Sequence, residues 1–247
     1  MLKIEIVKAL QDNYIFVLTC SETGKVGVMD PSQAFEVEEK LNGRRVDVVL
    51  NTHQHDDHCY GIKELVEKHH CQVYCPKKDI LDQIGACKYV DDKTLLNGLV
   101  HKDTVNIGET KLEVIEVPGH TQNHIAYYSE EEKILFSGDT LFAAGCGNIF
   151  DGDVEDLYKS LNKLKFLAKE TRVFCSHEYS LRNLEFALKE FPQLETLKAR
   201  YENAKLLLEN NMPMVPLRLS EELYTNPFLL APNLEIFRAL REKKDNF

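Results

Sequence analysis

Residues 51–60 read NTHQHDDHCY, with three histidines and two aspartates between positions 53 and 58. They directly follow Val46–Leu50 (VDVVL), an apolar and β-branched run that predicts a buried strand. Metal-binding side chains need rigid elements to hold them in place, and the end of a buried strand is such a position. This stretch therefore predicts a metal site around which the rest of the chain is organised.

Three further predicted strands also end in a residue that can bind a metal. The ends of neighbouring strands lie side by side in a sheet, so the side chains that follow them can converge. A glycine stands directly before two of these residues, at Gly119 and Gly138, and permits the unusual backbone angles that such a turn can need. The strands and the residues that follow them are 112–117 with His120, 134–136 with Asp139, and 172–175 with His177.

Together these segments supply five histidines and two aspartates as candidate ligands. Imidazole and carboxylate suit zinc, iron(II) or manganese, and a catalytic site leaves one position open for water. A single His-x-His pair or a lone histidine is more often an ordinary surface or core residue, but the joint pattern favours metal. Seven ligands are too many for one tetrahedral ion and fit two ions that share a carboxylate. The ligands are His53, His55, Asp57, His58, His120, Asp139 and His177.

The other histidines and the cysteines give more ordinary predictions. His69, His70 and His101 follow no predicted strand, and we expect them on the surface. His124 is a candidate for orienting a metal ligand by a hydrogen bond. The seven cysteines are odd in number and form no disulfide framework, so we expect buried free thiols in a reducing compartment. Cys59 stands next to a ligand, but we expect it to be inert as well.

The composition excludes some classes of partner. The chain of 247 residues has a net charge of −10, which argues against nucleic acid or an anionic membrane. An anionic substrate would therefore need a local cluster of cations. No apolar run approaches the roughly 20 residues of a membrane helix, and the start of the chain, MLKIEIVKALQDNY, lacks the features of a signal peptide. We expect a cytoplasmic protein, and nothing in the sequence indicates an oligomeric state.

The predicted elements divide the chain near His177. Before it, strands and helices are mixed, except that residues 77–103 show no readable pattern and suggest an irregular insertion. After it, apolar spacing predicts helices and no strand. We therefore expect two sheets with outer helices in residues 1–177 and a small helical domain or cap in residues 178–247. The predicted C-terminal helices are 181–191, 193–210 and 233–244.

The order and spacing of the seven ligands resemble the metallo-β-lactamase superfamily. The closer resemblance is to glyoxalase II, the hydroxyacylglutathione hydrolase family within it, and it covers essentially the whole chain. The stretches that carry it are Asp12-Asn13-Tyr14, Pro118-Gly119-His120-Thr121, Gly138–Gly147 (GDTLFAAGCG), His177-Glu178-Tyr179 and Arg241-Glu242-Lys243-Lys244-Asp245.

This resemblance implies an α+β fold, a four-layer αββα sandwich followed by a small all-helical C-terminal domain. It also implies two divalent metal ions, with zinc expected first and iron or manganese as alternatives. In the family's division of ligands, one ion takes His53, His55 and His120, the other takes Asp57, His58 and His177, and Asp139 bridges them.

The resemblance further implies that Tyr179, Arg241 and Lys244 contact glutathione. On spacing alone, Arg241 and Lys244 would be read as the solvated, cationic end of a helix. The chain departs from the family where a lysine and a tyrosine commonly follow Gly-Cys-Gly, because Asn148 and Phe150 stand there. These two positions are still candidate substrate contacts, but Asn148 contributes no charge. Residues 82–101 match the family poorly and receive no predicted role.

The implied reaction is hydrolysis of S-D-lactoylglutathione, or a similar 2-hydroxyacyl-glutathione thioester, to glutathione and D-lactate, the second step of methylglyoxal detoxification. A hydroxide bridging the two ions would be the nucleophile, because bound zinc lowers the pKa of water to about 7. Asp57 would be a ligand that also orients the water or relays its proton. The alternatives are a glutathione-persulfide dioxygenase with a single iron, another hydrolase of the superfamily, and a non-catalytic metal-binding protein. The last is disfavoured because all seven ligands are present.

Overall fold

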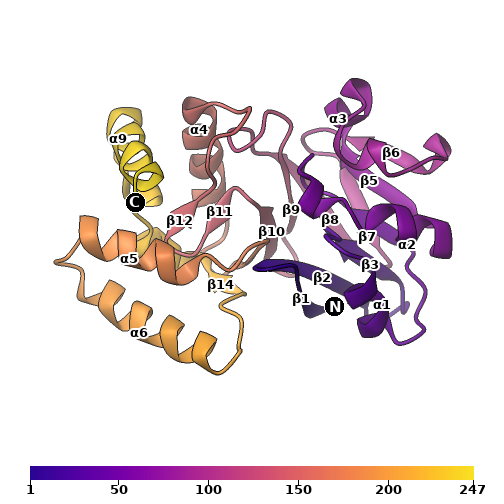
Figure 1. Cartoon of the computed structure of the whole chain (residues 1–247), viewed down its shortest axis with the longest axis horizontal. Coiled ribbons are helices and arrows are strands. Elements are labelled where there is room, and N and C mark those ends of the chain that lie inside the picture. The colour runs from indigo at the N-terminus through magenta and orange to yellow at the C-terminus, as the bar shows by residue number, and fades with distance from the viewer. The chain divides into compact units, whose positions relative to one another are not determined.

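The computed structural model describes every residue from Met1 to Phe247. Contacts within the chain divide it into two compact units (Figure 1). Unit 1 consists of Met1–Glu116 and Asn123–Glu132, and unit 2 consists of Val117–Gln122 and Lys133–Phe247. None of the helices has the length and apolar character needed to cross a membrane. The domain boundary expected between residues 177 and 178 stays a prediction.

Unit 1 contains a six-stranded sheet in the order β1-β2-β3-β4-β5-β6. β1 to β3 pair antiparallel, and β3 to β6 pair in parallel. A parallel pair needs a crossover connection, which contains α1 between β3 and β4 and α2 between β4 and β5. The bounds are β1 (Leu2–Ala9), β2 (Asn13–Cys20), β3 (Val26–Met29), α1 (Phe35–Leu41), β4 (Val48–Leu50), α2 (Ile62–His69), β5 (Gln72–Pro76) and β6 (Leu96–Leu99).

The ends of β3 and β4 place two loops at one edge of this sheet. The strands are parallel and Met29 pairs with Leu50, so the chain leaves both strands on the same side. Asp30 directly follows β3, and the metal motif directly follows β4. The motif forms a loop that includes a short 3-10 helix, η1 (Asp56–His58). The prediction that the motif follows a largely buried strand is confirmed, although the strand begins at Val48.

A second group of strands in unit 1 packs against the first sheet. β7 (Thr104–Ile107), β8 (Thr110–Glu116) and β9 (Ile125–Ser129) pair antiparallel. Buried and exposed residues alternate along β7, as expected for a strand with one face on a core. A Cβ built on Gly27 of β3 would lie 2.6 Å from Cδ1 of Ile107, so the side chain of Ile107 packs directly on the backbone of β3 at this contact between the two groups of strands.

Residues 77–103 are more regular than the sequence indicated. They contain α3 (Lys77–Asp82), η2 (Gly85–Lys88), η3 (Lys93–Leu95) and the strand β6. β6 pairs in parallel with β5 and extends the sheet, so the prediction of an irregular insertion is wrong there. The strand was hidden because Asn97 and Gly98 stand inside it, and both residue types are depleted in strands.

Unit 2 contains β10 (Ile134–Gly138), β13 (Arg172–Cys175) and β14 (Leu217–Arg218). β10 and β13 pair in parallel, with α4 (Val154–Lys165) between them in the chain, and β14 pairs antiparallel with β13. The prediction of no strand after His177 is therefore wrong, because a two-residue strand shows no periodicity. A short hairpin, β11 (Leu141–Phe142) and β12 (Gly145–Cys146), follows β10.

The remaining helices lie in the C-terminal part of the chain, as predicted. α5 and α6 run as a pair (Figure 1), with Leu184 and Leu197 in a shared apolar cluster. A buried ion pair between Arg200 and Glu222 joins α6 to α7, and Oε2 of Glu222 accepts a hydrogen bond from the Ala144 amide at 2.9 Å. The bounds are α5 (Ser180–Glu190), α6 (Glu195–Glu209), α7 (Leu219–Thr225), α8 (Pro227–Leu230) and α9 (Leu234–Asp245).

Candidate metal centre

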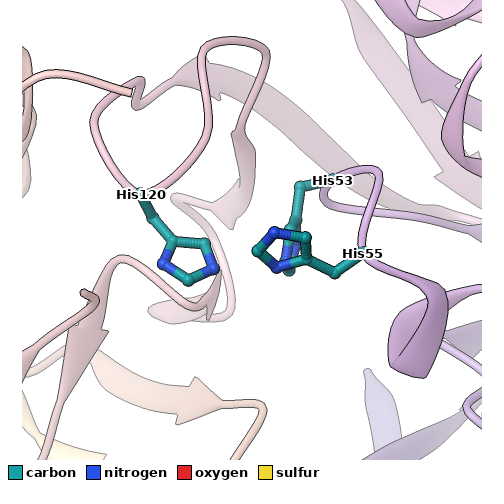
Figure 2. Close-up of side chains that lie close together, drawn as sticks. All are labelled: His53, His55 and His120. Atoms are coloured by element: carbon teal, nitrogen blue, oxygen red, sulfur yellow. The ribbon is translucent and has the colours of Figure 1, made fainter. Parts of the chain in front are cut away.

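Unit 1 contributes four of the predicted ligands from the loop after β4. His53 and His58 are buried, whereas His55 and Asp57 are partly exposed. Nε2 of His53 lies 3.0 Å from Nδ1 of His55, and Nε2 of His58 lies 3.6 Å from Oδ2 of Asp57. Figure 2 shows the imidazoles of His53 and His55 projecting from this loop, together with that of His120. The loop thus brings its four ligands together as two pairs.

Asp30 is buried directly after the end of β3 and binds residues of this loop. Its carboxylate accepts hydrogen bonds from the amide and hydroxyl of Thr52, at 2.8 and 2.7 Å, and lies 3.2 Å from Nδ1 of His58. Because the Thr52 hydroxyl donates to Asp30, it accepts from Nδ1 of His53, at 3.0 Å. Nε2 of both histidines is therefore the nitrogen that remains to bind a metal.

Asp30 received no predicted role at the metal site from the sequence alone. The signal that could have found it is the one that found the ligands, because Asp30 also directly follows a buried strand. The structure adds a reason for the Asp12-Asn13-Tyr14 stretch as well. Nδ2 of Asn13 donates to Oδ2 of Asp57 at 3.0 Å and to its main-chain oxygen at 3.2 Å, which fixes that ligand.

His124 and His69 are both buried but have different surroundings. The ring of His124 stacks on that of His53, with centroids 4.6 Å apart, so it supports this ligand by packing; its predicted hydrogen bond to a ligand stays a prediction. His69 lies 2.7 Å from a carboxylate oxygen of Glu38, and the prediction that it lies on the surface is wrong. It continues the buried stripe of α2, a spacing that could have revealed it. His70 and His101 are exposed, as expected.

Unit 2 contributes the other three ligands, and all are buried. Nε2 of His120 and Nε2 of His177 each lie 3.4 Å from the same oxygen of Asp139, Oδ2. This separation is longer than a usual hydrogen bond. It matches two ligand atoms on one tetrahedral ion, which lie about 3.4 Å apart when each is about 2.1 Å from the metal. Nδ1 of His120 is held by the main-chain oxygen of Asn148 at 2.7 Å, which again leaves Nε2 for a metal.

Glycines allow the loops of unit 2 to carry these ligands. Gly119 (φ 137°) and Gly138 (φ 51°) both adopt the backbone region that glycine favours, as predicted. Gly147 lies so close to the ligands that a Cβ there would be 2.1 Å from the main-chain oxygen of Asp139 and 2.9 Å from Nδ1 of His120.

The donor set fits divalent metal ions. Imidazole nitrogens and carboxylate oxygens are the donors that zinc, iron and manganese accept in proteins. Acceptor atoms that face one another in a buried site repel each other unless a cation or a proton lies between them. The groups of residues that could hold an ion are His53 with His55 and His120, His53 with His58 and Asp139, and Asp57 with His58 and His177.

Three of the predicted substrate contacts lie beside the ligands of unit 2. The ring of Tyr179 is partly exposed and stacks on His177, with centroids 4.8 Å apart and planes at 4°. Phe150 is exposed and its ring meets His120 edge to face, with centroids 5.2 Å apart. The side chain of Asn148 is exposed as well. A role of these residues in holding substrate stays a prediction.

The guanidinium of Arg241 is buried and binds groups of the protein itself. Only 2% of its surface is exposed. Nη1 donates to the main-chain oxygens of Cys146 and Gly147, each at 3.2 Å, and Nη2 pairs with Asp245 at 2.7 Å. The guanidinium therefore fastens the loop that contains Gly147, which in turn packs against the metal ligands.

Lys244 is partly buried among aromatic rings and other cations. Its Nζ lies over the rings of Phe186 and Phe247, at 5.4 and 5.2 Å from their centroids. It donates to the main-chain oxygen of Arg182 at 3.3 Å. Burial and the nearby charges of Arg182 and Arg241 lower the pKa of Lys244 to about 8. Sequence reasoning missed Arg182, whose signal was its place in the first turn of the helix that follows Tyr179.

All seven cysteines are free and buried, as expected. Cys59 directly follows a ligand, and Cys146 lies in the loop that Arg241 fastens. Burial raises the pKa of the Cys59 thiol well above its usual value, and raises that of Cys146 to about 11. Both thiols are therefore protonated near neutral pH and make poor nucleophiles.

In comparison with known proteins, two family models match consecutive parts of the sequence. The family model described as the Metallo-beta-lactamase superfamily matches residues 27–177, and the one described as Hydroxyacylglutathione hydrolase C-terminus matches residues 178–247. The chain is 40% identical to the hydroxyacylglutathione hydrolase of Bdellovibrio bacteriovorus, over 98% of this chain and 97% of that protein. It is 39% identical to that of Rhodospirillum rubrum, over 100% of this chain and 99% of that protein.

The fold is shared with solved structures. ETHE1 from Myxococcus xanthus superposes with a TM-score of 0.69 at 21% identity, over 98% of this chain and 90% of that one. This likeness concerns the fold alone. Together with the family matches, it confirms the predicted α+β metallo-β-lactamase fold with a helical C-terminal domain.

Proposed function

Because the chain belongs to the metallo-β-lactamase superfamily and, along its whole length, to the hydroxyacylglutathione hydrolases within it, we propose that it hydrolyses glutathione thioesters. The substrate is S-D-lactoylglutathione or a related 2-hydroxyacyl thioester, and the products are glutathione and D-lactate. The observation that carries the proposal is the ligand set itself. Three of its histidines have Nδ1 held by other groups of the protein, so that Nε2 is reserved for metal.

Two ions fit the donors better than one, since the chain offers seven ligands and a tetrahedral ion accepts four. His53, His55 and His120 are a group that could hold the first ion, and Asp57, His58 and His177 are a group that could hold the second. We assign Asp139 to both. Zinc is the first candidate, and iron and manganese accept the same donors.

The chemistry that bound divalent ions supply is a lower pKa for water and stabilisation of negative charge on a carbonyl oxygen. The residues of the chain do the positioning. Asn13 fixes the carboxylate of Asp57, which is 37% exposed at its side chain and can take up a proton from the attacking water. The water oxygen forms a new bond to the acyl carbon, the C–S bond breaks, and glutathione leaves as a thiolate that takes up the proton, so no serine or cysteine nucleophile is needed.

Substrate binding is assigned to the cations and rings of unit 2. Glutathione carries two carboxylates and one ammonium group, so its thioesters are anions near neutral pH. Lys244 and Arg182 are neighbouring cations in a chain whose net charge is −10, and they provide the local positive field that an anion needs. Tyr179, whose ring stacks on His177, is 38% exposed and offers an aromatic contact beside the ligands. Arg241 supports this site through the loop it fastens.

The test is a thioester assay on protein of known metal content. Purified protein is analysed for zinc, iron and manganese and is then mixed with S-D-lactoylglutathione, while the loss of thioester absorbance is followed. If metal-loaded protein showed no turnover above background, the hydrolase proposal would be refuted. Oxygen uptake with glutathione persulfide by a one-iron form would support the dioxygenase instead. Stoichiometric metal with no reaction on any thioester would support a non-catalytic protein.

A matched pair of variants tests the substrate site. Lys243 and Lys244 are adjacent on α9, but Lys243 is exposed and pairs with Glu190. Replacing Lys244 with glutamine should raise KM roughly tenfold or more, because a hydrogen bond to a charged group is worth about 1.5–3 kcal/mol. Lys243→Gln should leave KM unchanged. Equal KM values in the two variants would show that Lys244 does not bind the substrate.

A further inference from the structure

Residues 82–101, which match the glyoxalase II family poorly, contain a segment that packs onto the metal loop of unit 1. The contact is made by η2 and by Tyr89, which directly follows it. Both touch the residues that separate the metal ligands in the sequence, Gln54 and Asp56.

The first contact is a close approach of two backbones. Gly85 opens η2 with φ 55°. A Cβ built on it would lie 2.8 Å from Cα of Gln54 and 2.9 Å from a carboxylate oxygen of the buried Asp79. Real Cβ atoms do not tolerate such distances, so η2 rests directly on the backbone between His53 and His55.

The second contact is a hydrogen bond to the other spacer. The hydroxyl of Tyr89 donates to Oδ1 of Asp56 at 2.7 Å, and Nζ of Lys88 lies 3.8 Å from the same oxygen. The ring of Tyr89 also meets that of Tyr60, with centroids 5.9 Å apart and planes at 83°. A short bond to an ionised acceptor is stronger than a neutral one. Asp56 is therefore held between His55 and Asp57, the two partly exposed ligands.

The segment formed by η2 and Tyr89 is itself anchored to the rest of unit 1. Nζ of Lys93 donates to the main-chain oxygens of Cys87 and Val90, at 2.5 and 2.7 Å, and closes the end of η2. On the other side, Asp79 accepts from Nδ2 of Asn123 at 2.9 Å. Asn123 directly precedes His124, the residue that stacks on His53.

We propose that η2 and Tyr89 act as a clamp on the two spacer residues of the metal motif, and that Tyr89 is a positioning residue for His55 and Asp57. The clamp fixes the direction of these ligands before metal arrives, so the chain pays less ordering entropy when an ion binds. The inference rests on the metal centre proposed above. It assigns residues 82–101 a role in metal affinity.

The test compares two tyrosine variants that lose the same group. Tyr89→Phe removes the hydroxyl that binds Asp56, and Tyr201→Phe removes a hydroxyl that binds Glu185 on the surface of unit 2 at 3.2 Å. Zinc affinity is measured by competition with a chromophoric chelator, and the ligand geometry is followed in the d–d spectrum of cobalt-substituted protein. We expect Tyr89→Phe to weaken zinc binding about tenfold, at the low end of the effect of residues that orient metal ligands, and to shift the cobalt spectrum. Tyr201→Phe should change neither.

The acceptor is tested in the same way. Asp56→Ala should weaken zinc binding, and the double variant Asp56→Ala with Tyr89→Phe should be no weaker than Asp56→Ala alone, because both remove one shared bond. Zinc affinity and a cobalt spectrum unchanged in Tyr89→Phe would overturn the clamp, whatever happens to thermal stability. Wild-type protein that binds no metal would instead overturn the proposed function, so the two failures are distinct.

Discussion

Replacing Asp30 with asparagine should weaken metal binding without removing a ligand. The carboxylate only accepts hydrogen bonds, and this makes His58 donate from Nδ1 and keep the lone pair of Nε2 for a metal. An asparagine amide placed there can present N–H groups to Nδ1. That contact favours the opposite tautomer, in which Nε2 carries the proton and cannot bind an ion.

The magnitude follows from the bonds that Asp30 makes. It accepts two hydrogen bonds from Thr52 and contacts His58, and asparagine has one acceptor oxygen where aspartate has two. Losing one bond to a charged acceptor costs about 1.5–3 kcal/mol of stability. Residues that orient metal ligands typically change metal affinity by about 10–100-fold, or about 1.4–2.8 kcal/mol. We expect Asp30→Asn to lower the zinc affinity of the site formed by Asp57, His58 and His177 by about 10–100-fold.

The measurement uses chelator competition for zinc affinity and urea unfolding of the metal-free protein. Asp47→Asn is the matched control, because Asp47 also links β3 to the β4 region, through Val26 N at 2.9 Å and Lys25 Nζ at 2.7 Å, but touches no ligand. The control should lose some stability and keep its zinc affinity. Wild-type zinc affinity in Asp30→Asn, or an equal loss in Asp47→Asn, would refute the reasoning.

Three other changes test separate parts of the structure. Raising the pH from about 7 to about 9 should raise KM for a glutathione thioester, because Lys244 loses its charge around its pKa of about 8. Steady-state kinetics would measure this, and a KM that does not change with pH would contradict it. Gly147→Ala should lower kcat/KM by at least about tenfold, because the new methyl group would lie 2.1 Å from the main-chain oxygen of Asp139; activity equal to wild type would show that the loop can move freely. Glu222→Gln should lower the free energy of unfolding by about 1.5–3 kcal/mol in urea titrations, because it removes the buried counter-charge of Arg200 and leaves only the exposed carboxylate of Glu221, at 3.2 Å; a loss below about 0.5 kcal/mol would contradict that account.

The sequence was most informative where local pattern and chemistry agree. The run before Asn51 is apolar and β-branched, and the residues after it are metal donors, so strand and site were predicted by the same few letters. The conformations of Gly119 and Gly138 were predicted for the same reason, since each stands between a strand and a ligand. The long amphipathic helices of the C-terminal part also carry their own signal.

The features that were missed depend on partners far away in the chain. β14 is a strand only because Leu217 and Arg218 pair with Val173 and Arg172, and two residues carry no period. The role of Tyr89 requires knowing that η2 folds back onto Asp56, a contact between residues 33 positions apart. Pattern reading works within a short window, so contacts of this kind need the folded structure.

The burial of the cysteines matters for an enzyme whose product is itself a thiol. Thiol–disulfide exchange requires a thiolate and an open line of attack on sulfur. Cys59 and Cys146, which lie beside the ligand-bearing loops, are protonated near neutral pH and closed off from solvent. In the folded chain neither residue presents its sulfur to a disulfide such as glutathione disulfide, so we expect no mixed disulfide at either position. The site is built to release a reactive sulfur compound without being modified by it.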